Sequence, residues 1–356
     1  MDQNLNKIKE LKHYIKAVEI EKKILAQNYN LDNELRIFDV EVILNGLPTF
    51  IHTYVIGENN QETLVMLHGF GGSSLTFYKM YKQLATRFRV FALDFIGMGL
   101  SDRQNFNVVE NATQVINFFV NSIEQWRKVL GIQQFRIAGH SFGGYMAANY
   151  TVKYPSQVIE TYLLSPMAGT KVTPENDLQS EERFQEFVNK QPFLRKWAMK
   201  YMRCQAENQK MTPGKLLKKW FIPGNYLLKR AVQSRLKISD KTEAELWKNF
   251  LKNIFKLPQS TEHHIHDLVS MPGAQARLSI EQVVMESPNK IDVEFTIMFG
   301  DDDWMNKTGC QRLFKENYLQ GRVVEIKDAG HQLPFDQPDD ITNKILEQTK
   351  INIQVK

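Results

Sequence analysis

The sequence predicts an α/β fold: a mostly parallel sheet flanked by helices, with a helical insertion after the sixth strand. Short, almost wholly apolar runs alternate with segments at helical spacing between Thr63 and Pro166. Strands that are apolar at every position are buried on both faces, as in parallel sheets covered by helices. The alternation stops at Pro166 and resumes near residue 291, so the insertion separates two parts of one sheet.

Length and composition support one large domain with an insertion. The 356 residues are 42% hydrophobic, which suffices for a sizeable core. We expect an N-terminal helix within residues 1–30, a core made of 31–166 and 291–356, and a helical lid at 167–290. No apolar run approaches the roughly 18 residues of a membrane span, and the lysine-rich N-terminus lacks the apolar core of a signal peptide.

Apolar residues recur at helical spacing near the N-terminus and predict one amphipathic helix over residues 5–27. The residues of this stripe are Ile8, Leu11, Ile15, Val18 and Leu25. The stripe fits two roles: packing on the domain or a partner, and lying on a membrane surface.

The strands can be placed in order along the chain. LRIFDVEVIL and TFIHTYVIG flank Asn45-Gly46 and predict a β-hairpin. The next four strand predictions are TLVMLHGF, FRVFALDFIG, FRIAGHS and VIETYLLSP. After the insertion, VEFTIMFG and RVVEIKD predict two more strands, with helices beginning near Asn306 and Pro338.

The motif Gly139-His140-Ser141-Phe142-Gly143 lies between a predicted strand and a predicted helix. A hydroxyl is a weak nucleophile, and a tight strand-to-helix turn presents it to a base. Glycines on both sides prevent side-chain collisions in such a turn. This context favours Ser141 as a catalytic nucleophile over a chance occurrence of the motif.

An acid and a base follow in the order that a Ser-His-Asp mechanism needs. Asp301, Asp302 and Asp303 come after one predicted strand, and His331 comes after the next. A lone histidine in a loop is usually structural, but its position after the final strand favours a general base.

The segment LHGFGG closes an earlier strand and offers backbone N–H groups near Phe70. Together with the N–H of Phe142, at the start of the helix, they could hold an oxyanion. The alternative is an ordinary glycine turn.

The motifs HGFGG, DFIGMGLSDR, GHSFGGYMAANY, FGDDDWMN and GHQLPFDQP together resemble the α/β-hydrolase superfamily. More narrowly they are similar to the α/β-hydrolase-domain-containing branch four and five, over about residues 35 to 350. That branch includes lyso-N-acyl-phosphatidylethanolamine lipases, a lipid-droplet coactivator of triglyceride lipase, and proteins described as phospholipid deacylases or lysophosphatidate acyltransferases.

The resemblance implies roles for individual residues. The family acid precedes a Trp-Met pair, which selects Asp303 among the three aspartates. The coactivator lacks the nucleophilic serine, whereas this chain keeps Ser141. The family's His-x4-Asp motif, linked to acyl transfer, is matched by His331 and Asp336. Asp336 also fits a structural role as a cap of the final helix.

The insertion carries a strongly basic run. Between Lys190 and Lys237 there are thirteen Lys or Arg residues and one acid, Glu207, although the whole chain has a net charge of only +5. Aromatic residues are interleaved with them, which suits an anionic membrane or lipid-droplet surface. The membrane contacts expected here are Arg195, Lys196, Trp197, Lys218, Lys219, Trp220 and Phe221. A solvated inert face is the main alternative, and nothing resembles a nucleic-acid-binding module.

Metal and cofactor sites are not expected. The run EHHIHD, Glu262 to Asp267, has metal-ligand spacing but lacks a matching distant ligand. GMGLSD lacks the third glycine of a dinucleotide loop. The expected mechanism needs neither.

Together with the resemblance, these observations predict a serine hydrolase that cleaves lipid acyl esters at a membrane surface, as a deacylase of phospholipids, lysophospholipids or N-acyl phospholipids. Acyl transfer is a further activity that the resemblance implies. The alternatives are a lipid-droplet scaffold or lipase coactivator, and a soluble hydrolase of small esters or proline peptides. Two distant cysteines, Cys204 and Cys310, favour a reducing compartment over a disulfide framework. We expect a cytoplasmic protein at the surface of membranes or lipid droplets, and an organelle-associated pool, such as a mitochondrial one, is compatible with the sequence.

Overall fold

The computed structural model describes most of the chain outside the basic run. The described ranges are 7–31, 33–104, 106, 111–173, 236–270, 275–288 and 290–354, with side chains to residue 347. Isolated residues are also described at 182, 185–186, 188–189, 196, 212, 215, 228–230 and 232–233. No helix among these residues is long and apolar enough to cross a membrane.

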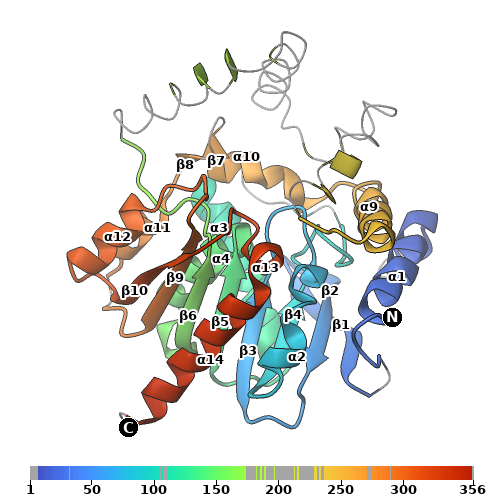
Figure 1. The fold of residues 1–356 in the computed structure, drawn as a ribbon, viewed down its shortest axis with the longest axis horizontal. Helices are drawn as coiled ribbons and strands as arrows, with labels where there is room; N and C mark the ends of the chain where they lie inside the picture. The colour runs from blue at the N-terminus through green and yellow to red at the C-terminus, as the bar shows by residue number, and fades with distance from the viewer. Residues whose placement is uncertain are drawn as a thin grey trace.

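An eight-stranded sheet forms the centre of the molecule, in the order β1-β2-β4-β3-β5-β6-β9-β10 (Figure 1). The strands are β1 (Leu35–Leu44), β2 (Leu47–Ile56), β3 (Glu62–Leu67), β4 (Phe88–Leu93), β5 (Phe135–His140), β6 (Val158–Leu164), β9 (Glu294–Gly300) and β10 (Gln320–Ile326). β1 and β2 pair antiparallel, β2 joins β4 antiparallel, and every other pairing is parallel. The mostly parallel sheet predicted from the apolar runs is therefore confirmed.

The hairpin turns where the sequence predicts it. Asn45 and Gly46 have φ angles of 47° and 78°, and positive φ at both central residues characterises the two-residue turns that match strand twist. Asparagine and glycine are the residues that adopt this conformation most readily.

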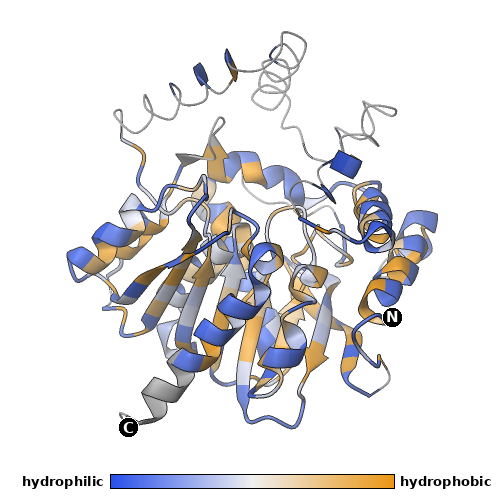
Figure 2. Ribbon diagram, in the orientation of Figure 1, coloured by the Kyte–Doolittle hydropathy of each residue, from blue (hydrophilic) through white to orange (hydrophobic). Residues whose placement is uncertain are grey.

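Helices cover both faces of the sheet. One hydrophobic cluster joins the sheet to α3 (Ala112–Val129), α4 (Phe142–Lys153), α11 (Ile280–Met285) and α12 (Thr308–Lys315). The other cluster joins it to α1 (Lys12–Leu25), α2 (Tyr81–Leu84), α9 (Lys241–Ile254), α13 (Leu333–Asp336) and α14 (Pro338–Gln354). Figure 2 shows hydrophobic residues along the central strands and hydrophilic ones concentrated on the helices.

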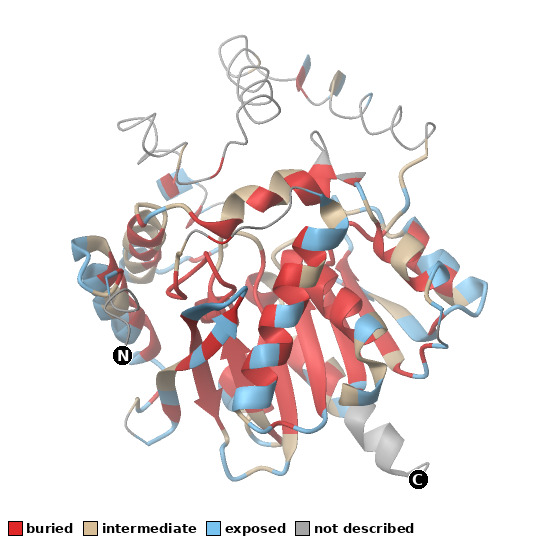
Figure 3. Cartoon of the chain, turned by 180° about the vertical axis from the view of Figure 1, so that it is seen from behind, coloured by how far each residue is buried: buried red, intermediate tan, exposed pale blue. Residues whose placement is uncertain are grey.

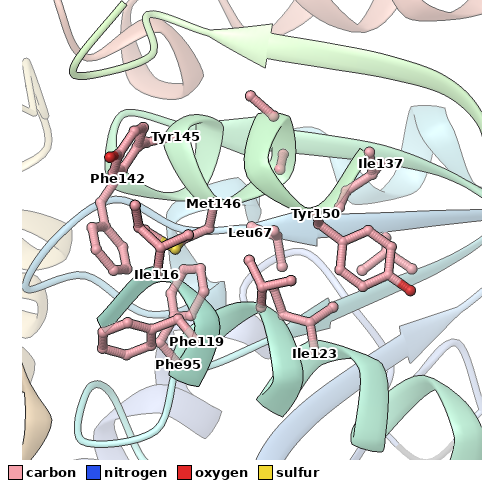
Figure 4. Packing of buried hydrophobic residues seen from close by; sticks show 14 of the residues in the cluster. Leu67, Phe95, Ile116, Phe119, Ile123, Ile137, Phe142, Tyr145, Met146 and Tyr150 are labelled. Atoms are coloured by element: carbon pink, nitrogen blue, oxygen red, sulfur yellow. The ribbon is translucent and has the colours of Figure 1, made fainter. Parts of the chain in front are cut away.

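Strand β3 shows how the two clusters share one sheet. Val65 and Leu67 pack into the first cluster, whereas Leu64 and Met66 pack into the second. Successive side chains of a strand point to opposite faces, so a continuous apolar run fills both layers. Figure 3, a view from behind, shows the central strands in the colour of buried residues. Aromatic side chains of α3 and α4 pack against one side of the sheet (Figure 4).

Side-chain caps mark where several helices begin. Asn111 accepts a hydrogen bond from Gln114 N at the start of α3, and Asp240 accepts one from Glu243 N at the start of α9. Ser279 and Gln282 form a reciprocal capping box at α11. Each cap satisfies backbone N–H groups that lack a partner within the helix.

The described part of the insertion packs on the core. Besides α9 and α11 it contains η3 (Thr261–His264), α10 (Ile265–Leu268) and two short strands, β7 (Val269–Ser270) and β8 (Gln275–Ala276). The sequence predicted only helices in the insertion and did not predict these two strands. The Trp247 ring of α9 lies 5.6 Å from Tyr78 and 5.3 Å from Phe335. The insertion thus contributes large side chains to the second hydrophobic cluster.

The N-terminal helix differs from the prediction. It begins at Lys12, and residues 7–10 before it form turns. Leu11 and Ile15, predicted on its apolar stripe, are exposed. The buried residues are Tyr14, Ala17, Glu21, Ile24 and Leu25. The predicted buried face was therefore wrong in part. The prediction followed apolar residues alone, whereas the face that packs on the sheet includes the charged residue Glu21.

A buried polar cluster holds α1 on the sheet. Glu21 accepts a hydrogen bond from the Tyr54 hydroxyl, and its carboxylate lies 3.3 Å from His52 Nε2. His52 Nδ1 lies 2.8 Å from Asp39 Oδ1. Burial alone would lower the pKa of His52, but the carboxylates of Glu21 and Asp39 raise that pKa well above its usual value. The helix is thus attached by a buried ion pair.

Glu21→Gln should lower the free energy of unfolding by about 3 kcal/mol or more, because it removes the wholly buried one of the two carboxylates that compensate a buried imidazolium. Urea denaturation at neutral pH measures this change. Glu19→Gln is the matched control on the exposed face of the same helix and should change stability by less than about 0.5 kcal/mol. Equal effects of the two substitutions would contradict a role for the buried pair.

Candidate active site

Four neighbouring strands deliver polar side chains to one edge of the sheet. β5, β6, β9 and β10 lie side by side and parallel. Ser141 follows β5, Ser165 follows β6, Asp303 lies in the loop after β9, and His331 lies in the loop after β10. Their strands bring together residues that are up to 190 positions apart in the sequence.

The turn that carries Ser141 is tight and strained. Ser141 has φ 54° and ψ −111°, a conformation that non-glycine residues seldom adopt. A Cβ atom on Gly139 would collide with the backbone of Gly143, and one on Gly143 would collide with the backbone of Leu67. Both glycines are therefore required by close approach of the backbone, as the motif predicted.

His331 contacts Ser141 directly. Its Nε2 lies 3.0 Å from Ser141 Oγ, which is the distance expected between a base and the hydroxyl that it activates. Its Nδ1 lies 3.4 Å from Asp303 Oδ1. A proton on Nδ1, facing the carboxylate, leaves Nε2 free to accept the hydrogen bond that Ser141 donates.

Among the three aspartates, Asp303 is the one that reaches His331. Asp301 instead accepts hydrogen bonds from Asp328 N and Ala329 N. Asp303 is buried, which alone would raise its pKa, but the nearby His331 imidazole and the hydrogen bond from the Ser165 hydroxyl hold that pKa below its usual value. The carboxylate is thus kept in the charged form that stabilises an imidazolium.

Ser165 lies between the acid and the base, and the sequence analysis missed it. Its Oγ is 2.6 Å from His331 Nδ1 and donates a hydrogen bond to Asp303 Oδ2. The signal for it was its position: a polar residue directly after β6, the strand that pairs with the strand before Asp303.

Two buried histidines hold the loops around Ser141. His140 Nε2 donates to the backbone oxygen of His331 at 2.8 Å, and burial lowers the pKa of His140 to about 3. His68 Nε2 accepts from Phe95 N at 3.0 Å, so its Nδ1 donates to Gly69 O at 2.8 Å. Burial lowers the pKa of His68 as well. Both rings are therefore neutral and each bonds a loop of the site.

Phe70 and Phe142 lie on the two elements expected to form an oxyanion hole. Phe142 is the first residue of α4, and Phe70 lies in the loop after β3. Their rings are 6.5 Å apart. A Cβ atom on Gly69 would lie 3.4 Å from Ser141 Cβ, so this loop passes directly over the serine.

Asp336 lies in the loop that carries His331. It is the last residue of α13, and its carboxylate accepts a hydrogen bond from Gly330 N at 2.9 Å. It also lies 3.0 Å from Lys237 Nζ, and its side chain is buried. The carboxylate therefore bonds across the loop that carries His331, from Asp336 to Gly330. The sequence instead suggested that Asp336 caps the final helix.

A small hollow, with room for little more than one water molecule, lies beside the loop of Phe70. Its lining includes Gly97, Gly99, Arg103, Ile254 and Glu262. The Arg103 guanidinium is almost wholly buried, donates to the backbone oxygens of Pro258 and Gly99, and lies 3.7 Å from Glu262. Burial lowers the pKa of Arg103, because its charge is incompletely compensated.

Most of the expected membrane contacts lie outside the described residues. These are Arg195, Trp197, Lys218, Lys219, Trp220 and Phe221. Lys196 is described, is partly exposed, and donates to Asn189 Oδ1 at 2.6 Å.

The histidine-rich run has partners within the protein. His264 Nδ1 lies 2.7 Å from Asp267 Oδ2, and His263 Nδ1 bonds the backbone oxygen of Ser260. The Glu262 carboxylate accepts a hydrogen bond from Ser260 N at 2.7 Å. Within the described ranges, no group of three or more His, Cys, Asp or Glu side chains is arranged to hold a metal ion.

Comparisons with known proteins agree with this fold. Residues 62–338 match the model of the α/β hydrolase fold family. The chain is 29% identical over 298 residues to a probable 1-acylglycerol-3-phosphate O-acyltransferase of Oryza sativa subsp. japonica, covering 82% of this chain and 68% of that protein. It is 29% identical over 312 residues to the human 1-acylglycerol-3-phosphate O-acyltransferase ABHD5, covering 86% and 82% of the two chains.

The chain is also similar to a lipase and to an esterase of known structure. The human (lyso)-N-acylphosphatidylethanolamine lipase is 25% identical over 331 residues, covering 92% of this chain and 87% of the lipase. The naproxen esterase of Bacillus subtilis superposes with a TM-score of 0.63 at 15% identity, over 95% of this chain and 99% of the esterase. The chain belongs to the α/β-hydrolase family, in the branch of these acyltransferase and lipase relatives.

Proposed function

We propose that this chain is a serine hydrolase that cleaves acyl esters of phospholipids or lysophospholipids at a membrane surface. The observation that carries the proposal is the 3.0 Å contact between Ser141 Oγ and His331 Nε2. That contact lies at the end of a strained strand-to-helix turn, where a nucleophile is presented to substrate.

The proposed mechanism uses these side chains in turn. Ser141 attacks the ester carbonyl while His331 Nε2 takes its proton, and the charge of Asp303 stabilises the imidazolium. The N–H groups of Phe70 and Phe142 hold the oxyanion, helped by the positive end of the α4 dipole. His331 then protonates the leaving alcohol, and water, activated by the same imidazole, releases the acid from the acyl-enzyme.

Acyl transfer requires only a different acceptor in the last step. If an alcohol of a second lipid replaces water, the acyl group passes to that lipid, which is the activity for which the rice and human acyltransferase relatives are named. Asp336 then acts through the His331 loop, because its carboxylate bonds Gly330 N and Lys237. Hydrolysis and transfer thus share Ser141 and His331.

An anionic head group placed at the hollow beside Phe70 would meet Arg103, and the hollow would have to widen to admit it. Arg103 is buried there with one carboxylate at 3.7 Å and two backbone oxygens as partners. A phosphate in this pocket would complete the compensation of the guanidinium, through charge-assisted bonds that are stronger than neutral ones. The buried guanidinium favours phospholipids over neutral esters as substrates, whereas the Glu262 carboxylate beside it opposes an anion.

The basic run supports action at a membrane. Its thirteen cations against one acid give it the charge that attracts anionic lipid, with basic residues near such a surface contributing about 1 kcal/mol each. We propose that residues 195–197 and 218–221 make this contact, in a cytoplasmic protein that binds membranes or lipid droplets peripherally.

The alternative functions differ in what they demand of Ser141. A scaffold or lipase coactivator needs no reactive serine, and a soluble hydrolase of small esters or proline peptides needs no membrane. A serine-directed fluorophosphonate probe separates the first alternative from an enzyme. Labelling of Ser141 in the folded protein supports catalysis, and absence of labelling supports the scaffold.

Ser141→Ala should reduce hydrolysis of a short-chain ester by about a thousandfold or more, because both nucleophile and proton donor are lost. Initial rates with a chromogenic ester measure this change, and circular dichroism confirms the fold. Ser122→Ala, a buried serine of α3 that bonds Phe119 O, is the control and should keep the rate. Full activity in Ser141→Ala would falsify the serine mechanism.

Arg103→Gln should lower kcat/KM for an acylglycerol phosphate about tenfold or more relative to an uncharged monoacylglycerol, since one charged hydrogen bond contributes about 1.5 to 3 kcal/mol. Mass spectrometry of the released fatty acid measures both substrates in one reaction. Arg277→Gln, at an exposed arginine outside the pocket, should leave the ratio unchanged. An unchanged ratio in Arg103→Gln would exclude the pocket as the head-group site.

Substitution of Lys218 and Lys219 by glutamate should weaken binding to vesicles that contain anionic lipid and leave binding to neutral vesicles unchanged, because a charge reversal opposes the surface potential. Co-sedimentation with the two vesicle types measures this difference. Reversal of Lys344 and Lys307, on α14 and before α12, serves as a control of equal charge. Identical losses in both double variants would point to net charge instead of a defined surface.

A further inference from the structure

The hydroxyl of Ser165 occupies the space between the acid and the base. Its Oγ is 2.6 Å from His331 Nδ1, closer than the 3.4 Å between that nitrogen and Asp303 Oδ1. The same hydroxyl donates a hydrogen bond to Asp303 Oδ2. The nearest partner of the imidazole is therefore a neutral hydroxyl, and the carboxylate lies behind it.

We infer that Ser165 is a positioning residue for the proposed reaction: its hydroxyl holds the Nδ1–H of His331 and links that ring to the charge of Asp303. This inference rests on the proposed function, since it assigns a role at the same site. It extends the Ser141–His331–Asp303 arrangement to a fourth side chain, which comes from a different strand.

Hydrogen-bond chemistry fixes the direction of this link. An ionised carboxylate only accepts hydrogen bonds, so the Ser165 hydroxyl must donate its single hydrogen to Asp303. Its lone pairs then accept from His331 Nδ1–H. That proton placement leaves Nε2 without hydrogen, ready to accept the proton of Ser141. The opposite direction would leave Asp303 without this donor and place a hydrogen on Nε2.

The backbone holds Ser165 firmly in this place. The residue is fully buried and has a φ of 47°, in the left-handed region that non-glycine residues rarely occupy. Such conformations cost about 1 to 3 kcal/mol and concentrate at functional sites. Ser165 N donates to Met298 O at 2.7 Å, and Met167 N donates to Ser141 O at 3.1 Å. The chain after β6 is thus bonded both to β9 and to the turn of Ser141.

Asp303 is not free to replace the hydroxyl. Its Oδ1 accepts a hydrogen bond from Met305 N at 3.0 Å, and its side chain is buried. Closing the 3.4 Å gap to His331 would disturb that bond. Loss of the Ser165 hydroxyl should therefore leave Nδ1–H with a poorer partner and allow the ring to turn.

Ser165→Gly is the decisive variant, because glycine removes the hydroxyl and accepts the positive φ without strain. We expect kcat/KM for a short-chain ester to fall about tenfold. The Nδ1–H proton of His331 should change its resonance position or exchange with solvent faster, because it loses its hydrogen-bond acceptor. This proton is read from ¹H–¹⁵N spectra of protein with labelled histidine and assigned with a His331→Gln spectrum.

Three outcomes are distinguishable. A changed Nδ1–H resonance of His331 in Ser165→Gly, with no change in Ser122→Ala, supports the inference. An unchanged resonance overturns it, whatever happens to the rate, because the hydroxyl would then not be the acceptor of that proton. Since NMR observes the Nδ1–H without turnover, the test has an answer even if Ser141 proves unreactive, an outcome that would defeat the proposed function alone.

Discussion

The site depends on the register of four parallel strands. Parallel pairing ends β5, β6, β9 and β10 at one edge of the sheet, with His140 opposite Leu164, Leu164 opposite Met298, and Gly300 opposite Ile326. Residues just beyond these strand ends therefore lie close together, and their loops need not contact one another for this to happen. A slip of one residue would turn every side chain of a strand to the other face, so the two hydrophobic clusters that fix the register also fix the geometry of the site.

Burial gives the histidines of this protein opposite roles. His68 and His140 are buried without a carboxylate partner in hydrogen-bond contact among the residues that the structure describes, and desolvation lowers the pKa of each. Each ring donates one hydrogen bond to a backbone oxygen in a loop of the site. His52 lies between the carboxylates of Glu21 and Asp39, which raise its pKa instead. The same side chain thus acts as a neutral hydrogen-bonding group beside Ser141 and as a buried cation beneath α1.

Sequence patterns predicted the features that depend on local spacing. The continuous apolar runs, the Asn45-Gly46 turn and the two glycines around Ser141 each follow from backbone geometry, and the structure contains all of them. Features that depend on partners distant in sequence were missed. Ser165 became visible only when β6 was paired with β9, and the buried face of α1 only when Glu21 was placed against β2. Choosing Asp303 required the family resemblance, because the spacing alone allowed Asp301 and Asp302 as well.

The insertion and the catalytic loop are joined by one carboxylate. Asp336 bonds Gly330 N, one residue before His331, and also pairs with Lys237 at the end of the basic run. Phe335, its neighbour, packs against Trp247 of α9. The end of the insertion is thus bonded to the loop that holds the imidazole, through Lys237 and Asp336. In the proposed acyl transfer, Asp336 would therefore act by fixing the placement of His331.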